Sequence, residues 1–126
     1  MKQINSILFA TDFSDSSGPA AEYAITMAEL TGAHLHVLHV INELDEHQRV
    51  MIPHEALQLL QKEVELQTVR ELEGFCKGQA AGISTTPHAV VGSAFQSILA
   101  TGAKVNADLV VMGTRGRTGV GQGSGG

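Results

Sequence analysis

Short apolar runs alternate along the chain with longer segments in which apolar residues recur at helical spacing. The runs are residues 6–10, 34–41, 84–91 and 109–112, and their lengths are those of buried strands. The run at 84–91 is the most polar and contains Pro87, which favours a position at the edge of a sheet. The pattern predicts four strands separated by three helices.

The first helix is predicted from Ser17 to Leu30. The segment from Thr11 to Ser17 is rich in residues that cap helix N-termini, and Gly32 stands where a C-terminal glycine is typical. Helical spacing places a set of small and apolar residues on the inner face: Ala21, Ala24, Ile25 and Ala28.

The second helix is predicted to be long, and the third to be short. The polar stretch 42–51 is interpreted as a loop, after which the helical pattern begins at Pro53 and ends by Gly82. The third helix follows Gly92-Ser93 and is closed by residues 106–108. The inner face of the long helix is predicted to comprise Leu57, Leu60, Val64, Val69, Leu72 and Cys76. The inner face of the third helix is predicted to comprise Phe95, Ile98, Leu99 and Ala103.

Strands that alternate with helices predict an α/β fold, with parallel strands and helices on both faces of the sheet. In open sheets of this kind, ligands bind beyond the carboxyl ends of the strands, near the point where strand order reverses. The expected ligand-binding segments are therefore residues 10–14, 40–43 and 113 onward.

Composition narrows the class of protein. The chain has 126 residues, which suits one domain. Aromatic residues make up 4% and Trp is absent, so aliphatic residues must build the core. The net charge of −5 argues against nucleic-acid and anionic-membrane partners. A single cysteine excludes an intramolecular disulfide, and no apolar run has the length of a signal peptide or a membrane span, so a cytoplasmic location is expected.

The stretch "GTRGRTG", Gly113 to Gly119, directly follows the fourth predicted strand. Its glycines allow close approach of the backbone to a ligand, and its N–H groups and arginines suit an anion. A solvated connection or tail is the alternative. The stretch is not a P-loop, because no Gly-Lys-Ser/Thr follows at the required spacing. It is not the dinucleotide fingerprint either, which follows a first strand.

Two further sets of residues are candidates. Asp12 in "ATDFS" follows the first strand and could accept a hydrogen bond from a ribose or hold a cation, or simply form a turn or helix cap. His34 and His36 are expected on one face of the second strand and His39 on the other. No matching ligand cluster is apparent, so a structural role is favoured over a metal site. Cys76 is interpreted as a core residue.

Three segments together resemble the universal stress protein family. They are "ATDFS", "LHVINE" and "ADLVVMGTRGRTGV", in the family's order, and the resemblance extends to about Gly121. It implies a Rossmann-like parallel sheet with strand order 3-2-1-4-5. On this basis residues 1–121 are expected to form the domain and residues 122–126 a flexible Gly/Ser tail or linker.

The family's nucleotide motif is Gly, two residues, Gly, nine residues, Gly and Ser or Thr. Gly113 and Gly116 match its first half, but nine residues further on stands Gly126 with no hydroxyl residue after it. Gly123-Ser124 comes too early. The family's last helix and fifth strand have no counterpart here, so the sheet is expected to have the order 3-2-1-4, and a truncated or rebuilt C-terminus is suspected.

The resemblance implies a site for ATP, or for ADP or AMP, accompanied by Mg²⁺. By matching position, Asp12 would bind the ribose, and the Val40 backbone would contact the edge of the base. The implied nucleotide-binding set is Ala10, Thr11, Asp12, Val40, Met112, Gly113, Arg115 and Gly116.

Several functional hypotheses remain open from the sequence. The first is an ATP-binding protein of stress response or signalling, at most a slow ATPase, because no residue stands out as a general base. The second is a nucleotide-free interaction module. The third, an adenylate-forming or hydrolytic enzyme, lacks an evident nucleophile. The resemblance also implies a homodimer or an oligomer with exchanged segments, because the edge of the fourth strand needs a cover.

Overall fold

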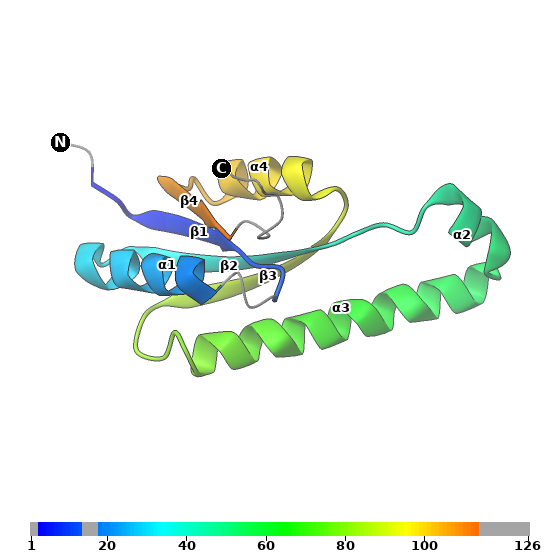
Figure 1. Ribbon diagram of the computed structural model, residues 1–126, viewed down its shortest axis with the longest axis horizontal. Coiled ribbons are helices and arrows are strands. Elements are labelled where there is room, and N and C mark those ends of the chain that lie inside the picture. The colour runs from blue at the N-terminus through cyan, green and yellow to red at the C-terminus, as the bar shows by residue number, and fades with distance from the viewer. Residues whose placement is uncertain (1–2, 14–17, 114–126) are drawn as a thin grey trace.

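The computed structural model describes residues 3–13 and 18–113, which form one parallel sheet with helices on both of its faces (Figure 1). The order of the strands across the sheet is β3-β2-β1-β4, as predicted. The strands are β1 (Ser6–Ala10), β2 (His34–Ile41), β3 (Thr85–Val91) and β4 (Leu109–Met112). The fold is therefore the expected Rossmann-like α/β arrangement, with Pro87 on an edge strand.

Four helices are described. They are α1 (Gly18–Thr31), α2 (Glu46–Met51), α3 (His54–Lys77) and α4 (Ala94–Lys104). Helices α1 and α3 cover one face of the sheet, and α4 lies on the other (Figure 1). This division follows from right-handed crossovers, because the chain moves one way across the sheet from β1 to β3 and then returns to β4.

The main core cluster lies between the two central strands and the helices α1 and α3. Its largest fully buried side chains are Phe9, Ile7, Leu35, Leu72 and Val37, whereas Leu8 and Leu38 are buried outside this cluster. Helix α1 contributes Ala21, Ala24 and Ala28 to the cluster, all buried as predicted, and the half-buried Ile25 packs against it. Small residues bring this helix close to the sheet, so the core needs little aromatic volume.

The start of β4 is fastened to the start of β1 by Asp108. Its carboxylate oxygen Oδ2 accepts hydrogen bonds from the backbone N–H groups of Asn5 (2.8 Å) and Ser6 (3.1 Å). Its own N–H donates to the carbonyl oxygen of Ser6 (2.7 Å). These bonds set the register in which Ile7 lies opposite Leu109, and this register brings the ends of the two strands together.

The interpretation of residues 42–51 as a loop is wrong, because α2 lies within them. Asp45 caps this helix: its side chain accepts from the N–H of Gln48 (2.7 Å), and the Gln48 side chain accepts from the N–H of Asp45 (3.0 Å). This reciprocal pair is a capping box, which stabilises a short helix without buried residues.

The predicted inner face of α3 is correct in part. Leu72 is buried and Leu57, Val69 and Cys76 are half-buried, whereas Leu60 and Val64 are exposed. The reason is visible in Figure 1, where α2 and the first turns of α3 extend past the end of the sheet. Thr68, which the apolar pattern missed, is buried instead.

The predicted inner face of α4 is also largely wrong. Phe95 is 72% exposed and Leu99 58% exposed, Ala103 is exposed, and Ile98 is half-buried. The apolar stripe of this helix continues onto β4 and lines a cavity of about 380 Å³ that reaches Met112. Among the described residues, no element covers this surface.

The remaining predictions about the C-terminus concern residues 114–126. Arg115, Gly116, the rest of the domain to residue 121 and the expected tail at 122–126 lie outside the described residues. In the described part of the chain, no helix is both long and apolar enough to cross a membrane.

Candidate functional site

A cavity of about 300 Å³ opens beyond the carboxyl ends of β1, β2 and β4. Its volume is at the lower end of the range of small-molecule sites. Six of the eight residues that the sequence singled out line it: Ala10, Thr11, Asp12, Val40, Met112 and Gly113. The other two, Arg115 and Gly116, lie outside the described residues. The cavity occupies the position at which open parallel sheets bind ligands, because β1 is where the strand order reverses.

The chain turns sharply after β1, and three hydrogen bonds fix this turn. The N–H of Thr11 donates to the carbonyl oxygen of Leu38 (2.8 Å), and the N–H of Phe13 donates to Oγ1 of Thr11 (3.0 Å). His39 donates from Nδ1 to the carbonyl oxygen of Thr11 (2.7 Å). Phe13 adopts a φ of 63°, which is uncommon for a residue with a side chain. The position of Asp12 is therefore set by bonds on both sides of it.

The Asp12 side chain is half-buried at the wall of the cavity. Of the described residues that line the cavity, Asp12 alone carries an ionisable side chain. A carboxylate in this place suits a hydroxyl or amine donor.

The backbone of Val40 faces the cavity. The carbonyl of Leu38 bonds to Thr11 beyond β1, and the carbonyl of Ile41 bonds to Gly92 beyond β3. Backbone polar groups alternate in direction along a strand, so the N–H and C=O of Val40 point to the β1 side, as those of Leu38 do. The pairing of β1 with β2 ends at Ala10 opposite Leu38, which leaves the Val40 groups aimed past the end of β1.

The remaining wall comes from β4 and from the start of α4. Met112 pairs with Ala10, and Gly113 follows it at the mouth of the cavity. The first backbone bond of α4 runs from the N–H of Ser97 to the carbonyl of Ser93, and no side chain caps the helix. The positive end of this helix therefore lies at the cavity, which Ala94 lines.

Two lining residues were missed by the sequence analysis: Ala94 and Ile98. A third, Asn42, lies just after β2 in the segment 40–43, which was expected to bind ligands. Ala94 and Ile98 come from α4, which returns across the sheet before β4. The strand-end rule could have indicated Ala94, because Gly92-Ser93 marks the start of a helix beyond β3.

The histidines lie away from this cavity, apart from His39. As predicted, His34 and His36 share one face of β2, with ring centroids 4.7 Å apart. Nδ1 of His36 is 2.9 Å from Nε2 of His88 on β3. Burial, followed by the charges of His34 and His88, lowers the pKa of His36 to about 4. In the described ranges, no group of three or more His, Cys, Asp or Glu side chains is arranged to hold a metal ion.

Comparison with known proteins agrees with the fold. The profile of the universal stress protein family matches residues 3–125. The fold is similar to that of hypothetical protein MJ0577, with a TM-score of 0.77 and 24% identity over 94% of this chain and 81% of that one. A protein of the same family from Burkholderia pseudomallei gives a TM-score of 0.67 and 20% identity over 88% and 82%.

A universal stress protein in complex with cAMP is also similar. Its TM-score is 0.58 and its identity 22%, over 86% of this chain and 71% of that one. No curated protein matches the chain. The match to the family profile, which spans nearly the whole sequence, therefore carries the assignment to a family, and the solved structures support the fold.

Proposed function

The chain belongs to the universal stress protein family, and from this premise we propose that it binds an adenine nucleotide in the cavity beyond β1, β2 and β4. ATP is the expected ligand, with ADP and AMP as related ligands. The observation that carries the proposal is the convergence of Ala10, Asp12, Val40 and Gly113, from three separate strand ends, on one cavity. A similar structure of a family member holds cAMP, which supports this class of ligand.

The base and the ribose are assigned to the β1 and β2 side of the cavity. The backbone N–H and C=O of Val40 offer a donor and an acceptor to the edge of an adenine ring. Asp12 accepts a hydrogen bond from a ribose hydroxyl, and Ala10 and Thr11 complete the wall. The turn that holds Asp12 is fixed in advance by its bonds to Leu38 and His39, so little conformational entropy is lost on binding.

The phosphates are assigned to the β4 side. Gly113 lets the backbone approach closely, and the N-terminus of α4 offers positive potential. Arg115 and Gly116 are proposed to add donors. Mg²⁺ would be held mainly by phosphate oxygens, with Asp12 as the nearby carboxylate.

The proposed activity is binding in stress response or signalling, rather than efficient catalysis. Asp12 is assigned to the ribose, and the described lining residues offer no second carboxylate and no histidine side chain to activate water. Slow hydrolysis of ATP is the most that this set of residues supports. We also propose that the domain spans residues 1–121 and that the protein acts in the cytoplasm.

Calorimetric titration of Mg²⁺-ATP into the chain tests the proposal. Micromolar binding is expected, and Asp12→Ala is expected to weaken it about 10- to 100-fold, because one charge-assisted hydrogen bond contributes about 1.5–3 kcal/mol. Gly113→Val should abolish binding by filling the mouth of the cavity. Glu63→Ala removes an exposed carboxylate on α3 and is the matched control. Absence of binding, or equal binding by all four proteins, contradicts the proposal.

A nucleotide-free module that forms a homodimer is the second candidate. The exposed apolar surface of α4 and β4 favours it, since Phe95, Leu99, Val110 and Met112 together leave a broad patch open. The edge of β4 also has no strand beside it among the described residues. We propose that a second copy of the chain, with or without an exchanged segment, covers this surface. Dimerisation is compatible with nucleotide binding, because the two surfaces share only Ile98 and Met112 among the described residues.

A further inference from the structure

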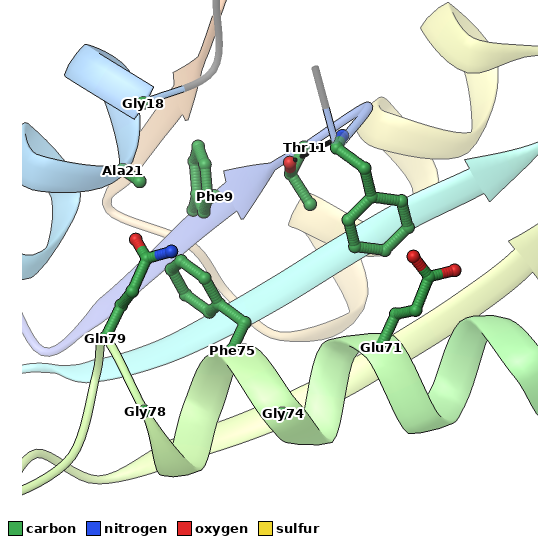
Figure 2. A pocket seen from close by; sticks show the side chains of 10 residues that line it. Phe9, Thr11, Gly18, Ala21, Glu71, Gly74, Phe75, Gly78 and Gln79 are labelled. Atoms are coloured by element: carbon green, nitrogen blue, oxygen red, sulfur yellow. Dashed lines mark hydrogen bonds between the residues drawn. The ribbon is translucent and has the colours of Figure 1, made fainter. Parts of the chain in front are cut away.

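A second, larger cavity lies on the opposite face of the sheet, between α1 and α3. Its volume is about 570 Å³. Figure 2 shows Glu71 and Phe75 rising into it from α3, with Phe9 of β1 and Ala21 of α1 across from them. Helices packed directly against each other would close this space. The residues that line it therefore indicate what it could bind.

Glycines from α1 and from the end of α3 line the cavity. Gly18 begins α1, while Gly74 lies in the last turns of α3 and Gly78 directly follows the helix. A Cβ atom built on Gly18 or Gly74 would meet no atom within 4 Å. Gly74 stands inside a helix, where glycine is among the least favourable residues. A side chain much larger than alanine at this position would project into the cavity, so Gly74 leaves this part of it free of side-chain atoms.

Aromatic rings form the floor and one wall. Phe9 is 1% exposed, and its ring centroid lies 5.8 Å from that of the half-buried Phe75. Phe13, at the turn after β1, adds a third ring. Its φ of 63° and its contact with His39, at 4.5 Å between centroids, fix its place. Rings on separate elements around an open space suit a flat aromatic ligand.

The charge of the cavity selects against anions. Glu71 is the one ionisable side chain among the described lining residues, and Thr11 and Gln79 supply neutral polar groups. Of the described residues that line the cavity, none is an arginine, lysine or histidine. A carboxylate beside phenyl rings favours a ligand that carries a positive charge next to an aromatic group.

We propose that this α1–α3 cavity is a second ligand site, which binds a planar aromatic amine with its ring against Phe9 and Phe75 and its ammonium group at Glu71. The site is separate from the proposed nucleotide site, which lies on the other face of the sheet. Among the described lining residues, the two sites share only Thr11. A nucleotide would bring its negative phosphates to Glu71 and is therefore excluded from this cavity.

Tryptamine is a suitable probe because its indole ring fluoresces and the protein contains no Trp. Fluorescence anisotropy of tryptamine, titrated with the full chain, is expected to give saturable binding with a dissociation constant below about 1 mM, as befits a small ligand. Indole-3-propionate has the same ring and the opposite charge. It is expected to bind at least about 10-fold more weakly, because Glu71 repels it.

Variants locate the site. Gly74→Leu projects a side chain into the cavity and is expected to weaken tryptamine binding at least about 10-fold, while Gly74→Ala, with its Cβ in open space, changes it little. Glu71→Gln should remove the preference for the amine over the acid. Glu73→Gln, an exposed neighbour on the same helix, is the matched control. Circular dichroism verifies that each variant is folded.

Three results would each overturn the proposal. The first is a wild-type chain that gives no saturable binding. The second is a folded Gly74→Leu variant that binds tryptamine as tightly as the wild type. The third is displacement of tryptamine by ATP together with loss of binding in Asp12→Ala, because the ring would then occupy the nucleotide site. The tryptamine titration itself contains no nucleotide, and ATP is added only in the displacement experiment, so the outcome of the titration is independent of whether ATP binds.

Discussion

Replacing Asp108 by alanine is expected to destabilise the domain and loosen the β4 side of the nucleotide site. The carboxylate of Asp108 accepts hydrogen bonds from the N–H groups of Asn5 and Ser6, which begin β1. The same residue precedes β4, so these bonds hold the two strands in register. With the carboxylate removed, the N–H of Ser6 is left in a partly buried place without that acceptor.

The magnitude follows from the two bonds. A hydrogen bond to a charged group contributes about 1.5–3 kcal/mol to stability. The bond to Asn5 is exposed to solvent, so it contributes less than the bond to Ser6. The free energy of unfolding should therefore fall by about 2–3 kcal/mol in Asp108→Ala. For a domain of this size, this loss corresponds to a decrease in melting temperature of about 6–12 °C.

Urea denaturation followed by circular dichroism measures this loss. Asp108→Asn is the matched control, because it keeps an oxygen acceptor without the charge and is expected to lose about half as much stability. If Asp108→Ala unfolds within about 0.5 kcal/mol of the wild type, the carboxylate does not fasten β4 to β1, and the reasoning is refuted.

Three further predictions concern other parts of the molecule. Burial lowers the pKa of His36 to about 4 and that of His88 below its usual 6.5, so the unfolded chain binds more protons than the folded chain in this pH range. The free energy of unfolding should therefore be highest above pH 6.5 and fall as the pH drops toward about 4. In acid denaturation, His36→Gln should make this dependence on pH shallower. Leu99→Glu is expected to convert a dimer into a monomer in size-exclusion chromatography with light scattering, whereas Leu59→Glu on the exposed part of α3 should not; a monomeric wild type contradicts this. Gly74→Ala should raise the free energy of unfolding by about 0.5–1 kcal/mol, since helix propensity improves without a clash, and a destabilised variant in urea denaturation would show that the space is not open.

The sheet could be predicted from the sequence because its strands are short and apolar and stand apart from one another. Both bounds of β2, His34 and Ile41, were predicted correctly, as was the edge position of β3 from Pro87. Helix α2 was missed because its stability comes from one capping box, not from an apolar stripe. Local hydrogen bonds between polar residues do not produce a hydrophobic periodicity, so a search for apolar stripes does not detect such a helix.

The faces of α3 and α4 could not be predicted from periodicity alone. An apolar stripe indicates that a face tends to be covered, but not which element covers it. Leu60 on α3 is 46% exposed and Phe95 on α4 is 72% exposed, because no described element covers either side chain fully. The sequence also could not show that the Val40 backbone faces the cavity, because this depends on where the pairing of β1 with β2 stops.

The central claim is that the ends of β1, β2 and β4 form one site for an adenine nucleotide. Mapping of ¹H–¹⁵N chemical shifts during titration with Mg²⁺-ATP tests it most directly. The largest shifts are expected at Thr11, Asp12, Val40 and Gly113, which line one cavity but lie far apart in the sequence. Shifts confined to other parts of the domain, or no shifts at millimolar nucleotide, would contradict the claim.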